Sequence, residues 1–304
     1  MINSTDFLKM TMVSTLVSTG WVSEQILSNI KNLRILDASW HLPIAKRDQQ
    51  EEYLQKHLPG AHFFDIDKCS RPCEGMQKLS HTLPTPDFFS EYVGNLGIDN
   101  ETHVVVYENN AKFGAFSAPR AWWMFRAFGH SKISIMEGGL PLWMKEGREI
   151  TDKIPLTEPS VFQASFKADL FKSFADIERN LEERKFQVMD ARVEGRFKGT
   201  QPEPREGVEP GHMPNSFNVP SPTMMVEKDG ILKFKSPDQL KETFEAAGLD
   251  MSQPIIASCG PGITACIITL GAYLAGTEGV AVFDGSWEEY YLKMKEINPE
   301  NILK

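Results

Sequence analysis

Cysteine is scarce in this sequence, with four residues in a chain of 304: Cys69, Cys73, Cys259 and Cys266. Their small number and uneven spacing argue against a secreted disulfide framework, and we expect a reducing, cytoplasmic environment with mitochondrial entry left open. No His or Cys cluster accompanies Cys69 and Cys73 at the spacing of a zinc site. We therefore expect neither a bound metal nor another cofactor.

Long apolar runs and an excess of positive charge are also absent. No segment approaches the roughly 18 apolar residues of a membrane span. Residues 1 to 19 contain one basic residue, Lys9, and no arginine, which argues against a secretory signal or a transit peptide. Lys and Arg number 32 against 41 Asp and Glu, a formal net charge of −9, so the protein as a whole repels polyanions. We expect no membrane and no nucleic acid as partners, and an anionic small substrate would need local arginines.

The chain repeats itself. Two stretches, roughly half a chain apart, carry similar short strings in the same order. The paired positions are Asp37 and Asp190, His57 and His212, Glu108 and Cys259, and Gly138 and Gly285. Four pairs in one order predict a duplicated domain.

Each repeat has the pattern of an α/β unit. Apolar runs without polar alternation, such as 104 to 107 and 254 to 257, are typical of strands buried on both faces of a parallel sheet. Helical segments lie between them; one begins with Ser236 as N-cap and Pro237 as first helical residue, and ends at Gly248. The sequence therefore predicts two tandem domains, each a mainly parallel sheet flanked by helices on both faces.

Composition sets the expected boundaries. A linker belongs where prolines stand among polar residues after residue 150. The predicted division is an N-terminal extension with the first helix at 1–28, a first domain at 29–150, a linker at 151–181 and a second domain at 182–298.

Cys259 stands where a buried strand ends and a loop with two glycines leads into a helix that begins near Thr264. Ligand sites of open α/β sheets lie beyond the carboxyl ends of the strands. Glycines allow successive backbone N–H groups to converge on an anion, such as a thiolate or a persulfide. We expect this field to lower the pKa of the thiol. The alternative is that Cys259 is simply a small buried residue before a glycine-rich turn. We interpret Cys266, which lies inside the helix, as a core residue of that kind.

The first repeat carries Glu108 at the position of Cys259, and no thiol follows it in the loop. We therefore expect one active site per chain, in the second domain.

Several strings of the chain resemble the tandem-domain rhodanese-type sulfurtransferases, from about Trp21 to Tyr291. The matching strings include residues 36–40, 59–67, 118–125, 195–197, 209–212, 259–264 and 284–287. The resemblance implies two rhodanese domains, an inactive first and a catalytic second, and a persulfide intermediate on Cys259.

The same resemblance suggests the sulfur donor. Thiosulfate enzymes of this family carry basic residues directly after the cysteine, whereas the loop Gly260-Pro261-Gly262 is uncharged and resembles the mercaptopyruvate type. Arg196 and Arg205 match the two substrate arginines of that type, and a guanidinium binds a carboxylate through two parallel hydrogen bonds. Taken alone, Arg205 would be interpreted as a solvated loop residue.

A proton relay of the family is only partly matched. Asp67 and His81 match two of its members, but Pro261 replaces the usual serine and offers neither a hydroxyl nor an N–H. The open alternatives are a water molecule, Thr264, His81 acting alone, or a shifted donor preference. His81 could equally be a surface-loop histidine.

The implied reaction moves sulfur from 3-mercaptopyruvate to Cys259, releases pyruvate and passes the sulfur to a thiol such as thioredoxin or a small dithiol. The backbone N–H groups of Gly260, Gly262, Ile263 and Thr264 would hold the persulfide. The alternatives are a thiosulfate sulfurtransferase and a non-catalytic redox-sensing or binding protein. A phosphatase on this fold needs an arginine six positions after the cysteine, where this chain has Ala265.

Overall fold

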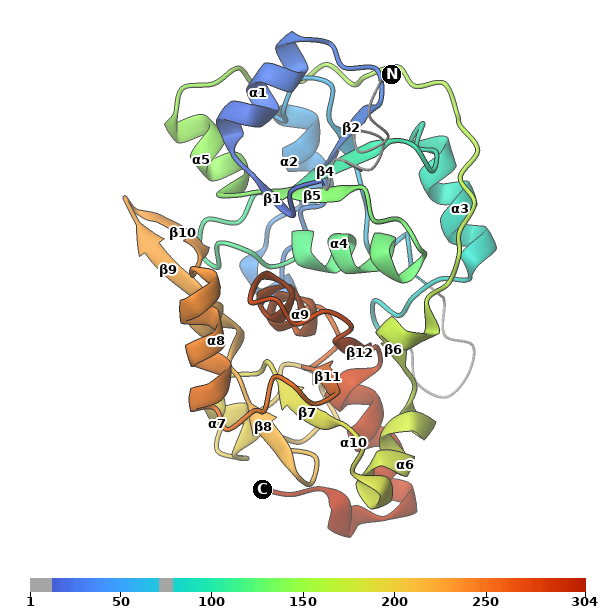
Figure 1. Cartoon of the computed structure of the whole chain (residues 1–304), viewed down its shortest axis with the longest axis vertical. Helices are drawn as coiled ribbons and strands as arrows, with labels where there is room; N and C mark the ends of the chain where they lie inside the picture. Colours follow the sequence, from blue (N-terminus) through green and yellow to red (C-terminus); the bar gives the residue numbers. More distant parts are fainter. Residues whose placement is uncertain (1–12, 71–78) are drawn as a thin grey trace, which may run out of the picture.

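The structure, a computed structural model, describes residues 13–70 and 79–304. Two α/β units follow one another along the long axis of the molecule (Figure 1). Cys73, one of the two cysteines that we expected not to bind a metal, lies outside the described residues. No helix among the described residues is long and apolar enough to cross a membrane.

Each unit is built on a five-stranded parallel sheet, and the two sheets have equivalent strand orders. The first sheet has the order β1-β5-β4-β2-β3 and the second β6-β12-β11-β7-β8. The strands of the first are β1 (Leu16–Val17), β2 (Leu33–Asp37), β3 (His62–Phe63), β4 (His103–Tyr107) and β5 (Ile133–Met136). Those of the second are β6 (Phe171–Lys172), β7 (Gln187–Asp190), β8 (Ser216–Asn218), β11 (Ile255–Ser258) and β12 (Ala281–Phe283). The predicted duplication is confirmed.

Helices pack on both faces of each sheet. The first unit contains α1 (Thr19–Leu27), α2 (Gln49–Gln55), α3 (Pro86–Asn95), α4 (Ala118–Ala127) and α5 (Gly139–Lys145). The second contains α6 (Phe174–Glu183), α7 (Glu194–Phe197), α8 (Pro237–Ala246), α9 (Ala265–Leu274) and α10 (Ser286–Ile297). An antiparallel hairpin, β9 (Met225–Lys228) and β10 (Ile231–Phe234), projects from the second unit toward the first (Figure 1).

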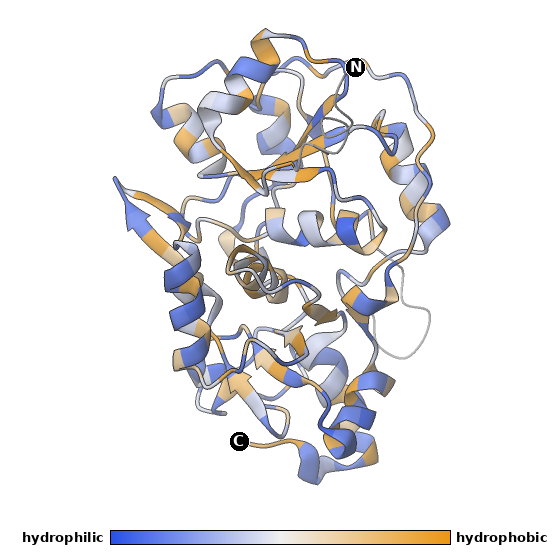
Figure 2. Cartoon of the chain, viewed as in Figure 1, coloured by the Kyte–Doolittle hydropathy of each residue, from blue (hydrophilic) through white to orange (hydrophobic). Residues whose placement is uncertain are grey.

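Local sequence accounts for the helix and strand limits near the site. All four residues of β11 are buried, as the unbroken apolar run predicted. Ser236 caps α8 as predicted, and it does so in a capping box: its hydroxyl accepts from the N–H of Gln239, and the Gln239 side chain accepts from the N–H of Ser236. Figure 2 shows apolar residues concentrated on the strands and polar residues on the outer helices.

Each sheet has one edge strand that lies outside the predicted domain boundaries of 29–150 and 182–298. β1, within the segment 1–28, pairs with β5 of the first sheet. β6 lies within the segment that we predicted as linker, and it pairs with β12 of the second sheet. α6 follows it at once, so the later part of that segment is folded onto the second unit.

α4 and α9 lie against each other between the two sheets (Figure 1). Nine residues of α4 and eight residues of α9 are buried, as expected for helices enclosed on all sides. One apolar cluster runs from the first unit through these two helices into the second. The two units therefore share a core, and the loops before α4 and α9 meet at their boundary.

Candidate active site

Cys259 follows β11 directly, and its side chain is fully buried beneath the loop that leads to α9. Its Sγ atom accepts a hydrogen bond from the N–H of Gly262 at 3.1 Å. The Thr264 side chain and the N–H of Ala265 also hydrogen-bond to this sulfur. Of the predicted donors, Gly262 and Thr264 thus contact the sulfur; Thr264 does so through its side chain, and Ala265 was not predicted.

A neighbouring segment holds the backbone of the cysteine loop. The Cys259 N–H donates to the Ser286 hydroxyl at 3.0 Å, and its carbonyl accepts from the N–H of Trp287 at 3.0 Å. The Gly260 carbonyl accepts from the N–H of Glu288 at 3.1 Å. The loop is therefore fixed by the start of α10 as well as by its own helix, α9.

Gly262 is required by this packing. Its φ of +87° is in the left-handed region, and a Cβ there would lie 2.4 Å from the Asp284 carbonyl oxygen. Ile263, next in the loop, is buried. Pro261 is half-buried between the two glycines and contributes no N–H to the loop.

Burial raises the pKa of the Cys259 thiol above its ordinary value of 9.0. The hydrogen bonds from Thr264, Ala265 and Gly262 act in the opposite direction, and the nearby Asp190 carboxylate adds to the rise. Our expectation of a lowered pKa is therefore wrong for this structure. The helix N-terminus and the loop donors do not compensate for the removal of a thiolate from water.

Arg196 lies beside the cysteine loop. A Cβ on Gly260 would be 2.8 Å from Arg196 Nη2, so the glycine leaves space for the guanidinium. The Nε of Arg196 donates to both carboxylate oxygens of Glu203, each at 3.1 Å. The Glu203 side chain is 1% exposed, which makes it a buried support for this arginine.

Arg205 also has a carboxylate partner. Its Nη1 lies 2.5 Å from Glu288 Oε2, and the Glu288 main chain holds Gly260. The interpretation of Arg205 as a merely solvated loop residue is wrong, because its side chain is tied to the segment that supports the cysteine loop.

A second buried arginine, Arg192, was missed by our sequence analysis. It bridges Asp190 at 2.6 Å and Glu203 at 2.8 Å, and its guanidinium lies 4.5 Å from the centre of the Trp287 ring. Asp190 and Arg192 surround the end of β7, beside β11, so position after a buried strand was the available signal. This network fixes Glu203, which in turn fixes Arg196.

A pocket of about 150 Å³ opens beside Arg196 and Thr264. Both units line it. Its apolar residues include Leu42, Phe113 and Phe116 from the first unit and Ile267 from the second. Such a pocket, apolar with a few charged groups, is typical of small-molecule sites.

Asp67 and His81 come together in the first unit. His81 Nδ1 lies 2.9 Å from Asp67 Oδ1, and the Trp40 indole N–H donates to Asp67 Oδ2 at 2.9 Å. Burial acts to raise the pKa of Asp67, but the hydrogen bonds with His81 and Trp40 hold it below its usual value. His81 is 7% exposed, so the alternative of a surface-loop histidine is wrong.

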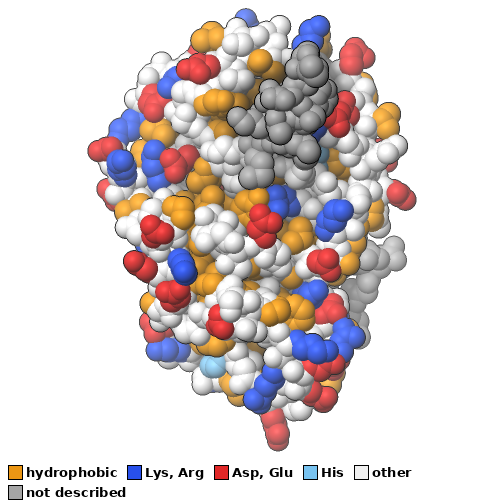
Figure 3. All heavy atoms as spheres, in the orientation of Figure 1, with side chains coloured by type: hydrophobic (Ala, Val, Ile, Leu, Met, Phe, Trp, Pro, Cys, Tyr) orange, Lys and Arg blue, Asp and Glu red, His pale blue; other side chains and the backbone are white. Residues whose placement is uncertain are grey.

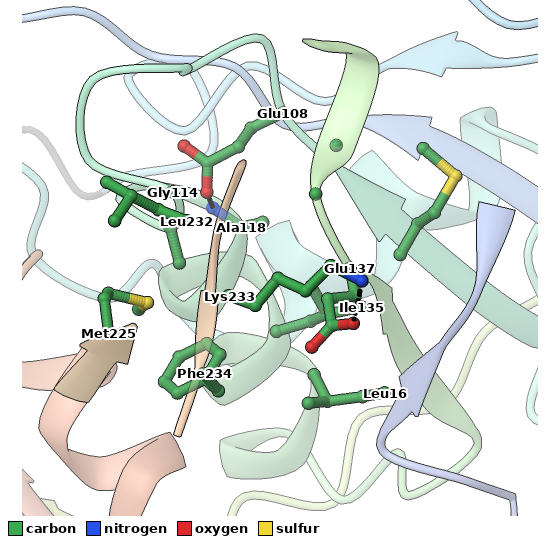
Figure 4. Close-up of a pocket in the computed structure, with 14 residues that line it drawn as sticks. Leu16, Glu108, Gly114, Ala118, Ile135, Glu137, Met225, Leu232, Lys233 and Phe234 are labelled. Carbon is green, nitrogen blue, oxygen red and sulfur yellow. Dashed lines mark hydrogen bonds and ion pairs between the residues drawn. The ribbon is translucent and has the colours of Figure 1, made fainter. Parts of the chain in front are cut away.

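The corresponding position of the first unit is filled by a carboxylate. Glu108 accepts hydrogen bonds from the N–H groups of Phe116, Ser117 and Ala118 at 2.7 to 3.1 Å. The β9–β10 hairpin covers this region, with Leu232 and Phe234 beside the pocket that Glu108 lines (Figure 4). The loop that donates to the Cys259 sulfur in the second unit is thus matched in the first by a loop that donates to the Glu108 carboxylate.

Neither the surface charge nor the described side chains indicate a further binding site of these two kinds, a single-sign charged patch on the face in Figure 3 or a metal-binding cluster among the described residues. Positive and negative side chains are interspersed over the face in Figure 3. Among residues 13–70 and 79–304, no group of three or more His, Cys, Asp or Glu side chains is placed to hold a metal ion.

Comparison with known proteins gives a family for this architecture. The model for the rhodanese-like domain matches residues 21–146 and 173–293. The chain is 44% identical over 290 residues to 3-mercaptopyruvate sulfurtransferase of Mus musculus, covering 95% of this chain and 94% of that protein. It is 46% identical over 279 residues to thiosulfate sulfurtransferase of Rattus norvegicus, covering 91% of each.

A solved structure agrees. SseA from Escherichia coli, described with the fold of 3-mercaptopyruvate sulfotransferases, superposes with a TM-score of 0.78 at 33% identity and covers 90% of this chain and 99% of that one. The chain belongs to the rhodanese family and is a tandem-domain sulfurtransferase. The expected fold and family are confirmed.

We predict that alkylation of Cys259 by iodoacetamide, without any donor, accelerates through and beyond pH 9.0. Burial favours the neutral thiol, so the reactive thiolate is scarce below the pKa and increases as the pH rises through it. The rate is measured on the tryptic peptide by mass spectrometry, with the urea-unfolded chain as control. A plateau already reached below about pH 8, under the ordinary thiol pKa, would contradict this.

Proposed function

We propose that the protein transfers sulfane sulfur from 3-mercaptopyruvate to a thiol acceptor through a persulfide on Cys259, with release of pyruvate. The observation that carries the proposal is the position of Arg196, whose guanidinium lies against Gly260 beside an uncharged, N–H-lined cysteine loop. A cation at that point serves a donor with a carboxylate a few bonds away from its sulfur.

The donor carboxylate and keto oxygen would bind toward Arg196 and Arg205. Arg196 uses Nε and Nη2 for Glu203, and among the described residues its Nη1 has no hydrogen-bond partner. Nη1 is therefore the group that we assign to the substrate. Because Glu203 fixes the guanidinium plane, the direction of this donor is set before substrate arrives.

In the first half-reaction, the Cys259 thiolate attacks the donor sulfur and forms an S–S bond. The C–S bond of the donor breaks, and its electron pair passes to the carbon, giving the enolate of pyruvate. The enolate takes one proton, and the sulfur remains as the terminal atom of a persulfide. The loop donors at Gly262, Thr264 and Ala265 would stabilise the negative charge on sulfur, and His81 with Asp67 would supply the proton.

In the second half-reaction, an acceptor thiolate attacks the terminal sulfur and restores the Cys259 thiolate. Thioredoxin or a small dithiol is the acceptor class that we propose. Two half-reactions that share one covalent intermediate give ping-pong kinetics.

Thiosulfate is the second candidate donor. The relatives of both donor types have nearly equal identity to this chain, 44% and 46%. The uncharged residues 260–262 favour mercaptopyruvate, because a dianionic donor would gain from cations in that loop.

We predict that 3-mercaptopyruvate without acceptor adds one sulfur to the tryptic peptide that contains Cys259. Mass spectrometry of the intact protein and its peptides measures the adduct, with thiosulfate in a parallel sample. Cys259→Ser should gain none, whereas Cys69→Ser, which changes a buried cysteine of the first unit, should behave as the wild type. No added sulfur from either donor, or an adduct carried by Cys266, would refute the proposed function.

Replacing Arg196 with Gln should lower kcat/KM for 3-mercaptopyruvate by about tenfold to a hundredfold, the effect of losing hydrogen bonds from a charged group. Turnover of thiosulfate should change much less. Arg179→Gln is the matched control, because Arg179 is an exposed arginine on α6 paired with Asp176. Equal losses with both donors would remove the assignment of Arg196 to the donor carboxylate.

Replacing Pro261 with Ser restores a hydroxyl and an N–H in the loop. If a serine relay limits proton transfer, 3-mercaptopyruvate turnover should rise by about tenfold or more relative to thiosulfate turnover. Pro159→Ser, at an exposed position between the units, is the control. An unchanged donor ratio would mean that this protein does not need the serine.

A further inference from the structure

Arg120 connects the thiol-free unit to the cysteine loop. It belongs to α4 of the first unit, and its side chain is 1% exposed. Its Nη2 lies 2.7 Å from Asp284 Oδ1, in the loop between β12 and α10 of the second unit. The same guanidinium donates to the carbonyls of His81 and, at 3.4 Å, Gly262.

Asp284 is the carboxylate of the second unit that Arg120 contacts, and both of its oxygens face groups of the first unit. Oδ2 accepts from the N–H of Leu83 at 2.7 Å, while Oδ1 faces Arg120. The residues that follow, 286–288, hold the backbone of Cys259 and Gly260. Arg120 therefore acts on the cysteine loop at two points, directly at Gly262 and through the segment after Asp284.

The contact at Gly262 fixes a peptide plane of the loop. In a trans peptide the carbonyl and the next N–H point in opposite directions. Holding the Gly262 carbonyl toward Arg120 therefore directs the Ile263 N–H to the other side of the loop. The Cys266 thiol donates to the same carbonyl at 3.5 Å, so the plane is held from both units.

The contact at His81 places the predicted relay on the same guanidinium. His81 has a φ of +62°, unusual for a residue other than glycine, and its ring packs edge-on against Trp40. Its carbonyl accepts from Arg120, and its ring faces Asp67. One side chain thus sets the distance between the relay pair and the sulfur-binding loop.

We propose that Arg120 is a positioning residue for sulfur transfer, which holds His81 and the cysteine loop in register across the boundary between the units. This role rests on the proposed function, and it gives the thiol-free unit a task in the reaction. The buried ion pair by itself is weak evidence for a purely stabilising role, because apolar replacements of such pairs are often neutral or stabilising.

The test compares Arg120→Gln, Arg120→Lys and Arg126→Gln. Arg126 is the matched control: it is on the same helix and also crosses the boundary, with its guanidinium 4.4 Å from the Tyr273 ring centre. It is half-buried, and its guanidinium lies over the rings of Trp122 and Tyr273. Thermal melting of each full-length variant reports folding before any rate is compared.

For 3-mercaptopyruvate, Arg120→Gln should lower kcat by about a hundredfold with little change in KM, as expected when reacting groups are misplaced by about 1 Å. Arg120→Lys should recover part of the loss, because it keeps the ion pair with Asp284 but cannot reach both carbonyls. Arg126→Gln should keep the wild-type rate.

Iodoacetamide provides a readout that does not require sulfur transfer. Arg120→Gln should alkylate Cys259 about tenfold faster than Arg126→Gln at one pH, because loss of a hydrogen bond from a charged group opens the loop. In Arg120→Gln the rate of sulfur transfer should thus fall while the rate of Cys259 alkylation rises. If Arg120→Gln does not fold, Arg120→Lys carries the same comparison with smaller effects.

The outcomes separate the two proposals. A folded Arg120 variant that matches Arg126→Gln in both rates would overturn the positioning role while the proposed function stands. A wild type that forms no persulfide would overturn the proposed function, and the alkylation rates would still decide whether Arg120 holds the loop.

Discussion

The packing of α4 against α9 is the contact on which this molecule depends. Both helices are buried on nearly all sides, so neither sheet can complete its core without the other unit. α9 is also the helix that begins directly after the cysteine loop. The helix that follows the cysteine loop is consequently part of the boundary between the units, and residues of both units line the pocket beside it.

Two opposing effects act on the Cys259 sulfur, and their balance describes the resting site. Removal from water favours the neutral thiol, whereas the loop donors favour an anion. In the resting state the first effect is larger. The hydrogen-bond donors of the loop are nevertheless already oriented toward the sulfur. Donors that are oriented before a reaction stabilise negative charge that develops during it.

Much of the fold was predictable, because buried parallel strands have unbroken apolar sequences and the repeat doubled the evidence. The position of Cys259 followed from the same pattern. Arg120 and Glu203 were not assigned roles, because each acts through partners brought close only by the tertiary fold. The predicted direction of the Cys259 pKa shift was wrong for a related reason. Local sequence shows the hydrogen-bond donors of a loop but not how completely the loop is buried.

Glu108 makes the two units of the duplicated molecule differ in whether the group held by the loop changes during the reaction. Its carboxylate is covalently part of the first unit, so that cradle keeps one occupant through every state of the protein. The corresponding cradle holds the Cys259 sulfur, and under the proposed function that sulfur gains and loses a second sulfur atom. Under that proposal the first unit serves as a fixed frame while the second passes through a catalytic cycle, so the duplicated fold separates support from turnover.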